Sequence, residues 1–266
     1  MSEQLTNFLN SDDAIFHYTK KETAMEDILN KKQLKFSFYH STNDPYEYKK
    51  RLTSAFGWGD INESLYLESM HLIDTTIQNT SFLSFCNNSN NTGHKKPRMW
   101  SQYGQNHSGI CLVFSKESFM TTIKNELSQN YLIYDENVNY KEIDFESLNI
   151  DNNDLIANEI VMTHIKRDYK NIFFQKHLDY KGENEFRIVL IQKDKNPFYQ
   201  SPLVDISNSL KLIILGDRFP NVYLPTIKDL STNLNIEFKQ LHWDHNQYFL
   251  FKKQESKEPA LNFKLL

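Results

Sequence analysis

Strand-like and helix-like segments follow one another irregularly along the chain, and this order constrains the fold class more than any other feature. Apolar runs of strand length occur at residues 80–85, 109–114 and 210–216, whereas longer helices are expected at about 62–78 and 153–177. The helices do not separate the strands in a regular βαβ repeat, so an all-parallel sheet is not expected. We predict an α+β fold with a central mixed, mostly antiparallel sheet flanked by helices.

Chain length and composition favour one domain with a substantial core. The chain has 266 residues, of which 39% are hydrophobic, and only seven are glycines. This profile is typical of a globular protein and argues against a repeat or loop-dominated design. We therefore expect a single domain at residues 1–250 and a loosely attached C-terminal tail at residues 251–266.

Charge, cysteine content and the N-terminal sequence argue against several classes of protein. A net charge of −4 provides no general footprint for nucleic acid, which would require a local basic patch. Two cysteines cannot form a disulfide framework and indicate a reduced intracellular setting. The N-terminus "MSEQLTNFLNSDD" lacks the basic and apolar regions of a leader, and no apolar run approaches the roughly 18 residues of a membrane span. We expect a cytoplasmic protein with no membrane partner.

The segment "YKGENEFRIVL" at residues 180–190 carries two acidic residues at alternate positions. Side chains of a strand alternate between its two faces, so Glu183, Glu185 and Arg187 would share one face. The apolar residues between and after them would form the core face. The two glutamates are then either a solvated surface balanced by Arg187 or the acidic half of an active site.

A histidine and two aromatic residues are further candidates, although each also has a common structural role. His17 lies on a short predicted strand, where a lone histidine is more often a core or surface residue than a catalytic one. Trp100, Tyr103 and His107 have the spacing of one face of a predicted helix. Aromatic residues on such a face usually serve in packing.

The motifs together resemble a widespread bacterial family. The segments "FHYT", "STNDPYE", "MWSQYGQNHSGICLVF", "YKGENEFRIV" and "LKLIILG" occur in the order and spacing of the domain of unknown function numbered 2971. The resemblance covers roughly residues 14–217. One departure is Tyr180, which stands where many members have tryptophan. This resemblance implies no particular reaction.

The opening pattern is also remotely similar to the first strand–helix–strand unit of ADP-ribosyltransferases, which include DNA-modifying toxins and RNA phosphotransferases of that fold. This resemblance implies an ADP-ribosyltransferase-like sheet and NAD as substrate, with no metal. One branch of the superfamily uses a histidine, a tyrosine and a glutamate from separate elements. His17, Tyr103 and Glu185 match these positions, and Glu183 matches the preceding acidic position. Rival aromatic residues for the tyrosine position are Tyr18, Tyr39 and Trp100.

The resemblance implies a role for each of these residues. Glu185 would stabilise the positive charge that develops on the ribose as nicotinamide leaves. His17 would hold the adenosine-side ribose, and Tyr103 would stack on nicotinamide. Glu183 would serve as a base toward an acceptor or water. Arg187 would pair with Glu183 or contact the pyrophosphate.

Five further residues complete the expected site. Tyr18, Thr19 and Trp100 are expected on the NAD-binding side. Asn43 and Asp44, in the turn "STNDPYE", are expected on the acceptor side, although their side chains can equally serve to close that turn.

The expected function is therefore NAD-dependent ADP-ribosyl transfer or NAD glycohydrolysis, with nucleic acid, protein or water as acceptor. Enzymes of this kind often serve as toxins or anti-phage effectors, and an inhibitory partner protein would fit that role. The principal alternative is a non-catalytic interaction or sensor module, in which the E-x-E-x-R strand is a structural ion-pair network.

A metal-dependent nuclease is less favoured because the chain has few clustered aspartates, and a zinc site is disfavoured by irregular ligand spacing. The nuclease would use Asp44, Glu183 and Glu185, and the zinc site would use Cys86, His94, His107 and Cys111.

Overall fold

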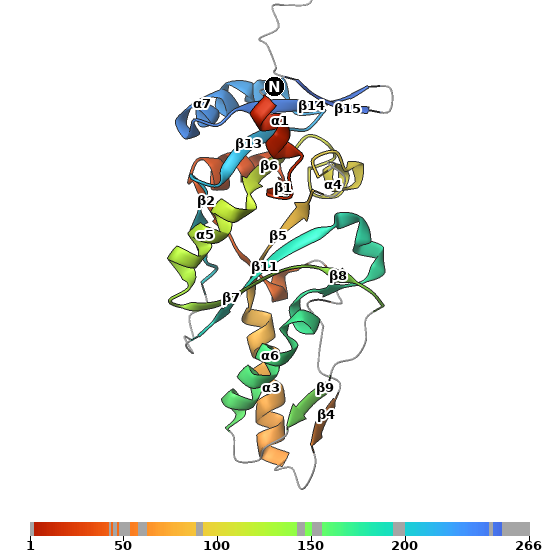
Figure 1. Cartoon of the computed structure of the whole chain (residues 1–266), viewed down its shortest axis with the longest axis vertical. Helices are drawn as coiled ribbons and strands as arrows, with labels where there is room; N and C mark the ends of the chain where they lie inside the picture. Colours follow the sequence, from red (N-terminus) through yellow and green to blue (C-terminus); the bar gives the residue numbers. More distant parts are fainter. Residues whose placement is uncertain are drawn as a thin grey trace, which may run out of the picture.

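A large mixed sheet forms the centre of the molecule (Figure 1). The computed structural model describes residues 3–42, 44, 47, 54–57, 63–88, 93–142, 147–150, 156–193, 200–244 and 247–251. Within them, the strand order of the main sheet is β15-β14-β13-β6-β1-β5-β11-β7, and β3 also pairs with β5. The strands are β1 (Ala14–Thr19), β3 (Ser37–Phe38), β5 (Ser81–Asn87), β6 (Ile110–Ser115), β7 (Tyr131–Asn137), β11 (Glu185–Gln192), β13 (Leu210–Leu215), β14 (Phe238–Asp244) and β15 (Gln247–Phe251).

Neighbouring strands of this sheet run antiparallel in the described residues, except that β13 and β14 are parallel. The register places Cys86 of β5 opposite both Phe16 of β1 and Glu185 of β11. It also places Ser84 opposite Arg187. Since directly opposed residues point to the same face, Ser84, Glu185 and Arg187 lie on one face of the sheet.

Helices cover both faces of the sheet. One face packs against a π-helix, η1 (Thr23–Leu29), and against α5 (Lys116–Leu127) and α7 (Leu224–Leu234). The other face packs against α1 (Glu3–Leu9) and α4 (Pro97–Gln102). The strands between these layers are buried on both faces, which explains why β6 and β13 are almost wholly apolar.

A pair of helices extends away from the sheet, as Figure 1 shows at its lower end. These helices are α3 (Glu63–Asn79) and α6 (Ala157–Phe173), and they share an apolar core with β11. Three two-stranded sheets complete the fold: β2 (Gln33–Lys35) with β12 (Leu203–Asp205), β8 (Asn139–Tyr140) with β10 (Gln175–Lys176), and β4 (Ser54–Gly57) with β9 (Ser147–Ile150). Short 3₁₀ helices occur at η2 (Tyr39–Ser41), η4 (Leu178–Glu183) and η5 (Asn221–Tyr223).

The predicted α+β class with a mixed, mostly antiparallel sheet between helices is confirmed. The prediction of a loose tail falls on residues that lie outside the described ranges, apart from Phe251 at the end of β15. Among the described residues, no helix combines the length and the apolar character that a bilayer span requires.

The prediction that Trp100, Tyr103 and His107 share one helical face is wrong, because His107 does not lie in a helix. The helix α4 ends at Gln102, and the backbone of the three residues 105–107 is left-handed, with φ of 50°, 51° and 69°. Left-handed backbone is costly for residues with a side chain, so it persists only where tertiary contacts hold it. One such contact is the hydrogen bond from the Arg218 backbone N–H to the His107 carbonyl, at 2.9 Å.

The predicted strand at 180–190 begins later than expected. Residues 178–183 form the 3₁₀ helix η4, and Asn184, with φ of 50°, turns the chain into β11. Glu183 therefore precedes the strand and does not share a strand face with Glu185. The left-handed residue at this junction interrupts the two-residue alternation on which the prediction depended.

We expect Gly216→Ala to destabilise the protein by about 1–3 kcal/mol, the range for overpacking a close contact. A Cβ atom at Gly216 would lie 2.1 Å from the His107 carbonyl oxygen, so the backbone would have to move. The matched control is Gly182→Ala, whose Cβ would meet only the Arg98 side chain at 3.4 Å. Denaturant unfolding of both variants measures the difference, and equal stabilities would contradict the close approach.

Candidate functional site

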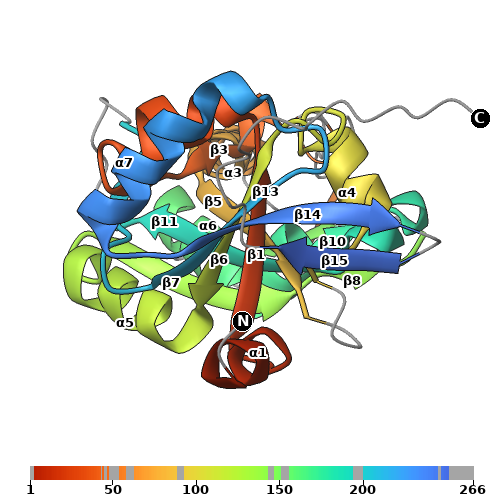
Figure 2. The same cartoon turned by 90° about the horizontal axis from the view of Figure 1, so that it is seen from above.

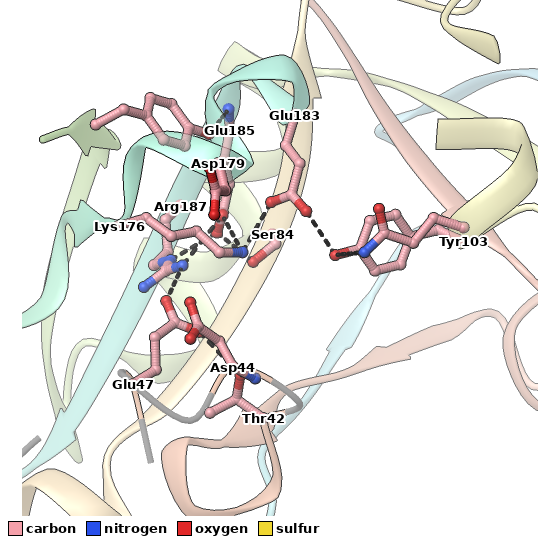
Figure 3. A network of polar contacts seen from close by, with 12 residues as sticks. Thr42, Asp44, Glu47, Ser84, Tyr103, Lys176, Asp179, Glu183, Glu185 and Arg187 are labelled. Carbon is pink, nitrogen blue, oxygen red and sulfur yellow. Dashed lines mark hydrogen bonds and ion pairs between the residues drawn. The ribbon is translucent and has the colours of Figure 1, made fainter. Parts of the chain in front are cut away.

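Arg187 lies at the centre of a buried polar network on β11 (Figure 3). Its Nε donates to Glu185 Oε1 at 2.6 Å, and its Nη2 donates to Glu47 Oε1 at 2.6 Å and to Glu185 Oε2 at 3.0 Å. Its Nη1 donates to the Tyr39 hydroxyl and to the Phe173 carbonyl, each at 2.8 Å. All five guanidinium N–H groups are thus satisfied, as a side chain that is only 1% exposed requires.

Aromatic rings enclose this guanidinium. The Arg187 Cζ lies 5.1 Å from the ring centroid of Phe82 and 5.7 Å from that of Tyr39, within the range of cation–π contacts. Phe82 belongs to β5 and Tyr39 to η2, so the arginine joins its own strand to two other segments. Burial raises the pKa of the Tyr39 hydroxyl, which keeps it neutral beside Arg187.

Glu185 is held ionised at the start of β11. Burial alone would raise the pKa of its carboxyl, but the charges of Arg187 and Lys176 outweigh burial and lower the pKa to about 2. The Ser84 hydroxyl donates a further hydrogen bond to Glu185 Oε1. The backbone N–H of Glu185 donates to the Tyr140 hydroxyl at 2.8 Å. Glu185 is therefore an ionised carboxylate whose two oxygens both accept hydrogen bonds.

Glu183 forms the second half of the network and contacts Tyr103. The Tyr103 hydroxyl donates to Glu183 Oε1 at 2.7 Å, and Lys176 Nζ donates to Glu183 Oε2 at 2.7 Å. The same ammonium lies 3.5 Å from Glu185 Oε2, so Lys176 bridges the two glutamates. Figure 3 shows Tyr103 approaching Glu183 from the side opposite to Arg187. Burial and the Glu183 charge raise the pKa of Tyr103, which remains a neutral donor.

The described ion pairs of the network join three buried carboxylates to two buried cations. Arg187 pairs with Glu47 and Glu185, and Lys176 pairs with Glu183 and Glu185. Carboxylates fixed in this way can stabilise a positive charge that develops beside them during a reaction.

The turn predicted at "STNDPYE" positions Glu47 within this network. The Thr42 hydroxyl donates to Glu47 Oε2 at 2.8 Å, and the Asp44 backbone N–H donates to Thr42 Oγ1 at 3.2 Å. Asp44 is buried in the turn, while Asn43 lies outside the described residues. The turn thus closes through its own side chains and also brings a carboxylate to Arg187.

His17 lies apart from Tyr103 and Glu185. Its β1 neighbour Phe16 pairs with Cys86 on the face of Glu185, so the His17 side chain points to the other face, where it packs at 5.7 Å on Phe85. Its Nδ1 contacts the Ser84 carbonyl at 3.2 Å. Burial lowers the pKa of His17. Among the described residues, it shares no hydrogen bond with Tyr103 or Glu185, and Ser84 connects the two sides of the sheet.

The expected NAD-side aromatic residues Tyr18 and Trp100 are packed inside the protein. Trp100 is 0% exposed and donates through Nε1 to the His94 carbonyl at 2.8 Å. The Tyr18 ring meets it edge-on at 5.0 Å, and the Tyr18 hydroxyl donates to the Gly93 carbonyl. Thr19 is half-buried at the end of β1. Tyr103, by contrast, is half-buried and donates a hydrogen bond to a carboxylate of the network.

Five network residues were not among the predicted site residues: Tyr39, Glu47, Ser84, Tyr140 and Lys176. Glu47 had a signal in the N-D-P-x-E motif, and Tyr39 was noted as a rival aromatic residue. No sequence signal marked Lys176, because β10 is only two residues long and lies outside every quoted motif. In the part of the chain that the structure describes, no group of three or more His, Cys, Asp or Glu side chains could hold a metal ion.

We expect Arg187→Met to lower the free energy of unfolding by about 3–5 kcal/mol at pH 7, the usual cost of breaking a buried ion pair from one side. The substitution leaves the carboxylates of Glu185 and Glu47 buried without their main counter-charge. The control, Lys124→Met, removes an exposed cation from α5 and should be nearly neutral.

The loss of unfolding free energy in Arg187→Met should be smaller at acidic pH. With Arg187 present, Glu185 contributes stability above its unfolded pKa of 4.5, and this is lost as the pH falls toward the folded value of about 2. Without Arg187, the buried carboxyl takes up a proton more readily, so the two proteins converge below about pH 4. Denaturant unfolding at pH 7 and pH 3.5 measures this, and a pH-independent difference would contradict the assignment.

Comparison with known proteins supports the family resemblance expected from the motifs. The family model described as "Protein of unknown function (DUF2971)" matches residues 99–188, a shorter span than the motifs had indicated. No curated protein and no solved structure matches the chain. The match covers less than half of the chain, and the matched residues supply the network with Tyr103, Tyr140, Lys176, Glu183, Glu185 and Arg187.

Proposed function

We propose that the chain cleaves the nicotinamide–ribose bond of NAD and acts as an ADP-ribosyltransferase or NAD glycohydrolase. The observation that carries the proposal is the position of Glu183, between the Tyr103 hydroxyl and the Lys176 ammonium. This carboxylate is buried, and its second contact is Tyr103, a half-buried residue. Departure of nicotinamide leaves positive charge on the ribose, and a fixed negative field lowers the energy of that state.

Glu183 is better suited to the reacting role than Glu185, which the sequence motifs had favoured. Both carboxylate oxygens of Glu185 accept hydrogen bonds from Arg187. One carboxylate oxygen of Glu183 accepts a hydrogen bond from the Lys176 ammonium, and the other accepts one from the neutral hydroxyl of Tyr103. A ribose hydroxyl of the substrate can replace that hydroxyl as donor. In this proposal Glu185 and Arg187 position Lys176, and Lys176 orients Glu183.

Two half-buried aromatic rings stand beside this carboxylate and suit the nicotinamide ring. Tyr103 contacts Glu183 directly. The Tyr180 ring centroid lies 4.6 Å from Lys176 Nζ, so it flanks the same ammonium. Tyr180 stands where many family members have tryptophan, and either side chain offers an aromatic face.

His17 enters the proposal only through Ser84, and the acceptor is nucleic acid, protein or water. An NAD-consuming activity suits a toxin or anti-phage effector that an inhibitory partner protein controls.

The test is the release of nicotinamide from NAD by purified protein, with and without a cell lysate, followed by mass spectrometry of the products. We expect activity from the wild type and a loss of roughly 10²–10³-fold in Glu183→Gln, the usual effect of removing a preorganised electrostatic group. Tyr103→Phe should retain more activity than Glu183→Gln, because a substrate hydroxyl can take the place of the lost one. Glu117→Gln, at an exposed position on α5, is the control and should behave as wild type.

A second candidate function, a non-catalytic interaction or sensor module, is favoured by two observations. All guanidinium N–H groups of Arg187 are satisfied within the protein, and His17 lies on the opposite face of the sheet. This alternative predicts that Glu183→Gln and Glu185→Gln change the melting temperature, while wild-type protein releases no nicotinamide under any condition. Such a result would exclude the enzymatic proposal and leave the network a purely structural role.

A further inference from the structure

A separate cavity lies at the carboxyl end of β13, beside the middle of β14. Its volume is about 640 Å³, and Asp217, Arg218, Phe219, Gln240 and His242 contribute to its walls. These two strands are joined through α7 and form the one parallel pair in the described part of the main sheet. Figure 1 shows α7, β13 and β14 together at one end of the molecule, far from α3 and α6, and Figure 2 shows α7 and β14 from above, in front of the other elements.

Hydrogen bonds hold the loop that forms the floor of this cavity. Gln240 Nε2 donates to the carbonyls of Gly216 and Asp217, each at 3.2 Å. The Arg218 backbone N–H donates to the carbonyl of His107, in the left-handed turn after α4. The loop after β13 is therefore attached both to β14 and to the turn. A loop held in this way can present side chains in a set arrangement without a ligand.

Two charged side chains of this loop retain unused binding capacity. Asp217 Oδ1 accepts from His242 Nδ1 at 2.8 Å and from the Trp243 backbone N–H at 3.3 Å. Asp217 Oδ2 and the exposed Arg218 guanidinium make no hydrogen bond or ion pair with any residue that the structure describes. The cavity wall thus offers an acceptor oxygen beside a cation that can bind an anion through two parallel N–H bonds.

We infer that this cavity binds a phosphorylated sugar, either free or as part of a nucleotide. Guanidinium matches the geometry of phosphate, and a carboxylate oxygen accepts hydrogen bonds from sugar hydroxyls. The cavity volume lies within the usual range for small-molecule sites, about 300–1,000 Å³. The crevice at the carboxyl ends of parallel strands is the usual place for such ligands in α/β units. The site shares no residue with the network around Arg187 and is independent of the NAD proposal.

Calorimetric titration with inorganic phosphate, ribose 5-phosphate and AMP tests this inference. Ribose 5-phosphate and AMP should bind at least about 10-fold more tightly than inorganic phosphate, because only they present hydroxyls to Asp217. Tighter binding of AMP than of ribose 5-phosphate identifies a nucleotide as the ligand, and equal binding identifies the sugar phosphate itself. No binding of any probe, or inorganic phosphate as tight as ribose 5-phosphate, would overturn the inference.

Two variants assign the binding to the proposed side chains. Arg218→Gln should weaken all three probes by at least about 10-fold, the loss of one charge-assisted contact. Asp217→Asn should weaken ribose 5-phosphate and AMP while leaving inorganic phosphate at least as tightly bound. Lys124→Gln, on α5, is the control for loss of one exposed cation. Unchanged affinities in Arg218→Gln would place the ligand elsewhere, whatever the outcome of the NAD assay.

Discussion

The pairing of Arg187 with Glu185 and Glu47 is the interaction on which the rest of the site depends. A buried guanidinium is costly unless every N–H group finds an acceptor, and here the acceptors come from β11, η2, the turn at Glu47 and the end of α6. The charge therefore ties four segments into one arrangement. Removing any acceptor exposes an unmet donor, so these segments hold their relative positions together.

Lys176 extends this arrangement to a second carboxylate. The ammonium lies between Glu183 and Glu185, and both charges raise its pKa against the opposing effect of burial. Glu183 is oriented on one side by a cation and on the other by the neutral hydroxyl of Tyr103. The two glutamates are both buried and differ in their partners: both oxygens of Glu185 accept from Arg187, whereas Glu183 accepts from Lys176 and from the half-buried Tyr103. Differing environments are a common way for proteins to give different roles to neighbouring carboxylates.

Much of the fold could be predicted because local patterns carried it. The strands β6 and β13 are apolar runs of strand length, and α3 begins within one residue of its predicted start. Site residues were predictable only where a motif marked them. Tyr103, Glu183, Glu185 and Arg187 do meet in one network, but His17 lies on the other face, because strand register decides which face a residue occupies.

The sequence by itself determined the class of fold, the similarity of residues 99–188 to the DUF2971 family and the presence of charged residues that had to be neutralised within the fold. The tertiary structure alone decided which counter-charges perform this task. Lys176 and Glu47 reach the network from 7 and 140 residues away from their partners Glu183 and Arg187. It also decided that Glu183 leaves the strand, since Asn184 adopts a left-handed backbone that no alternation pattern reveals. Burial drives both outcomes, because a charge removed from water must find its partners wherever the packed chain supplies them.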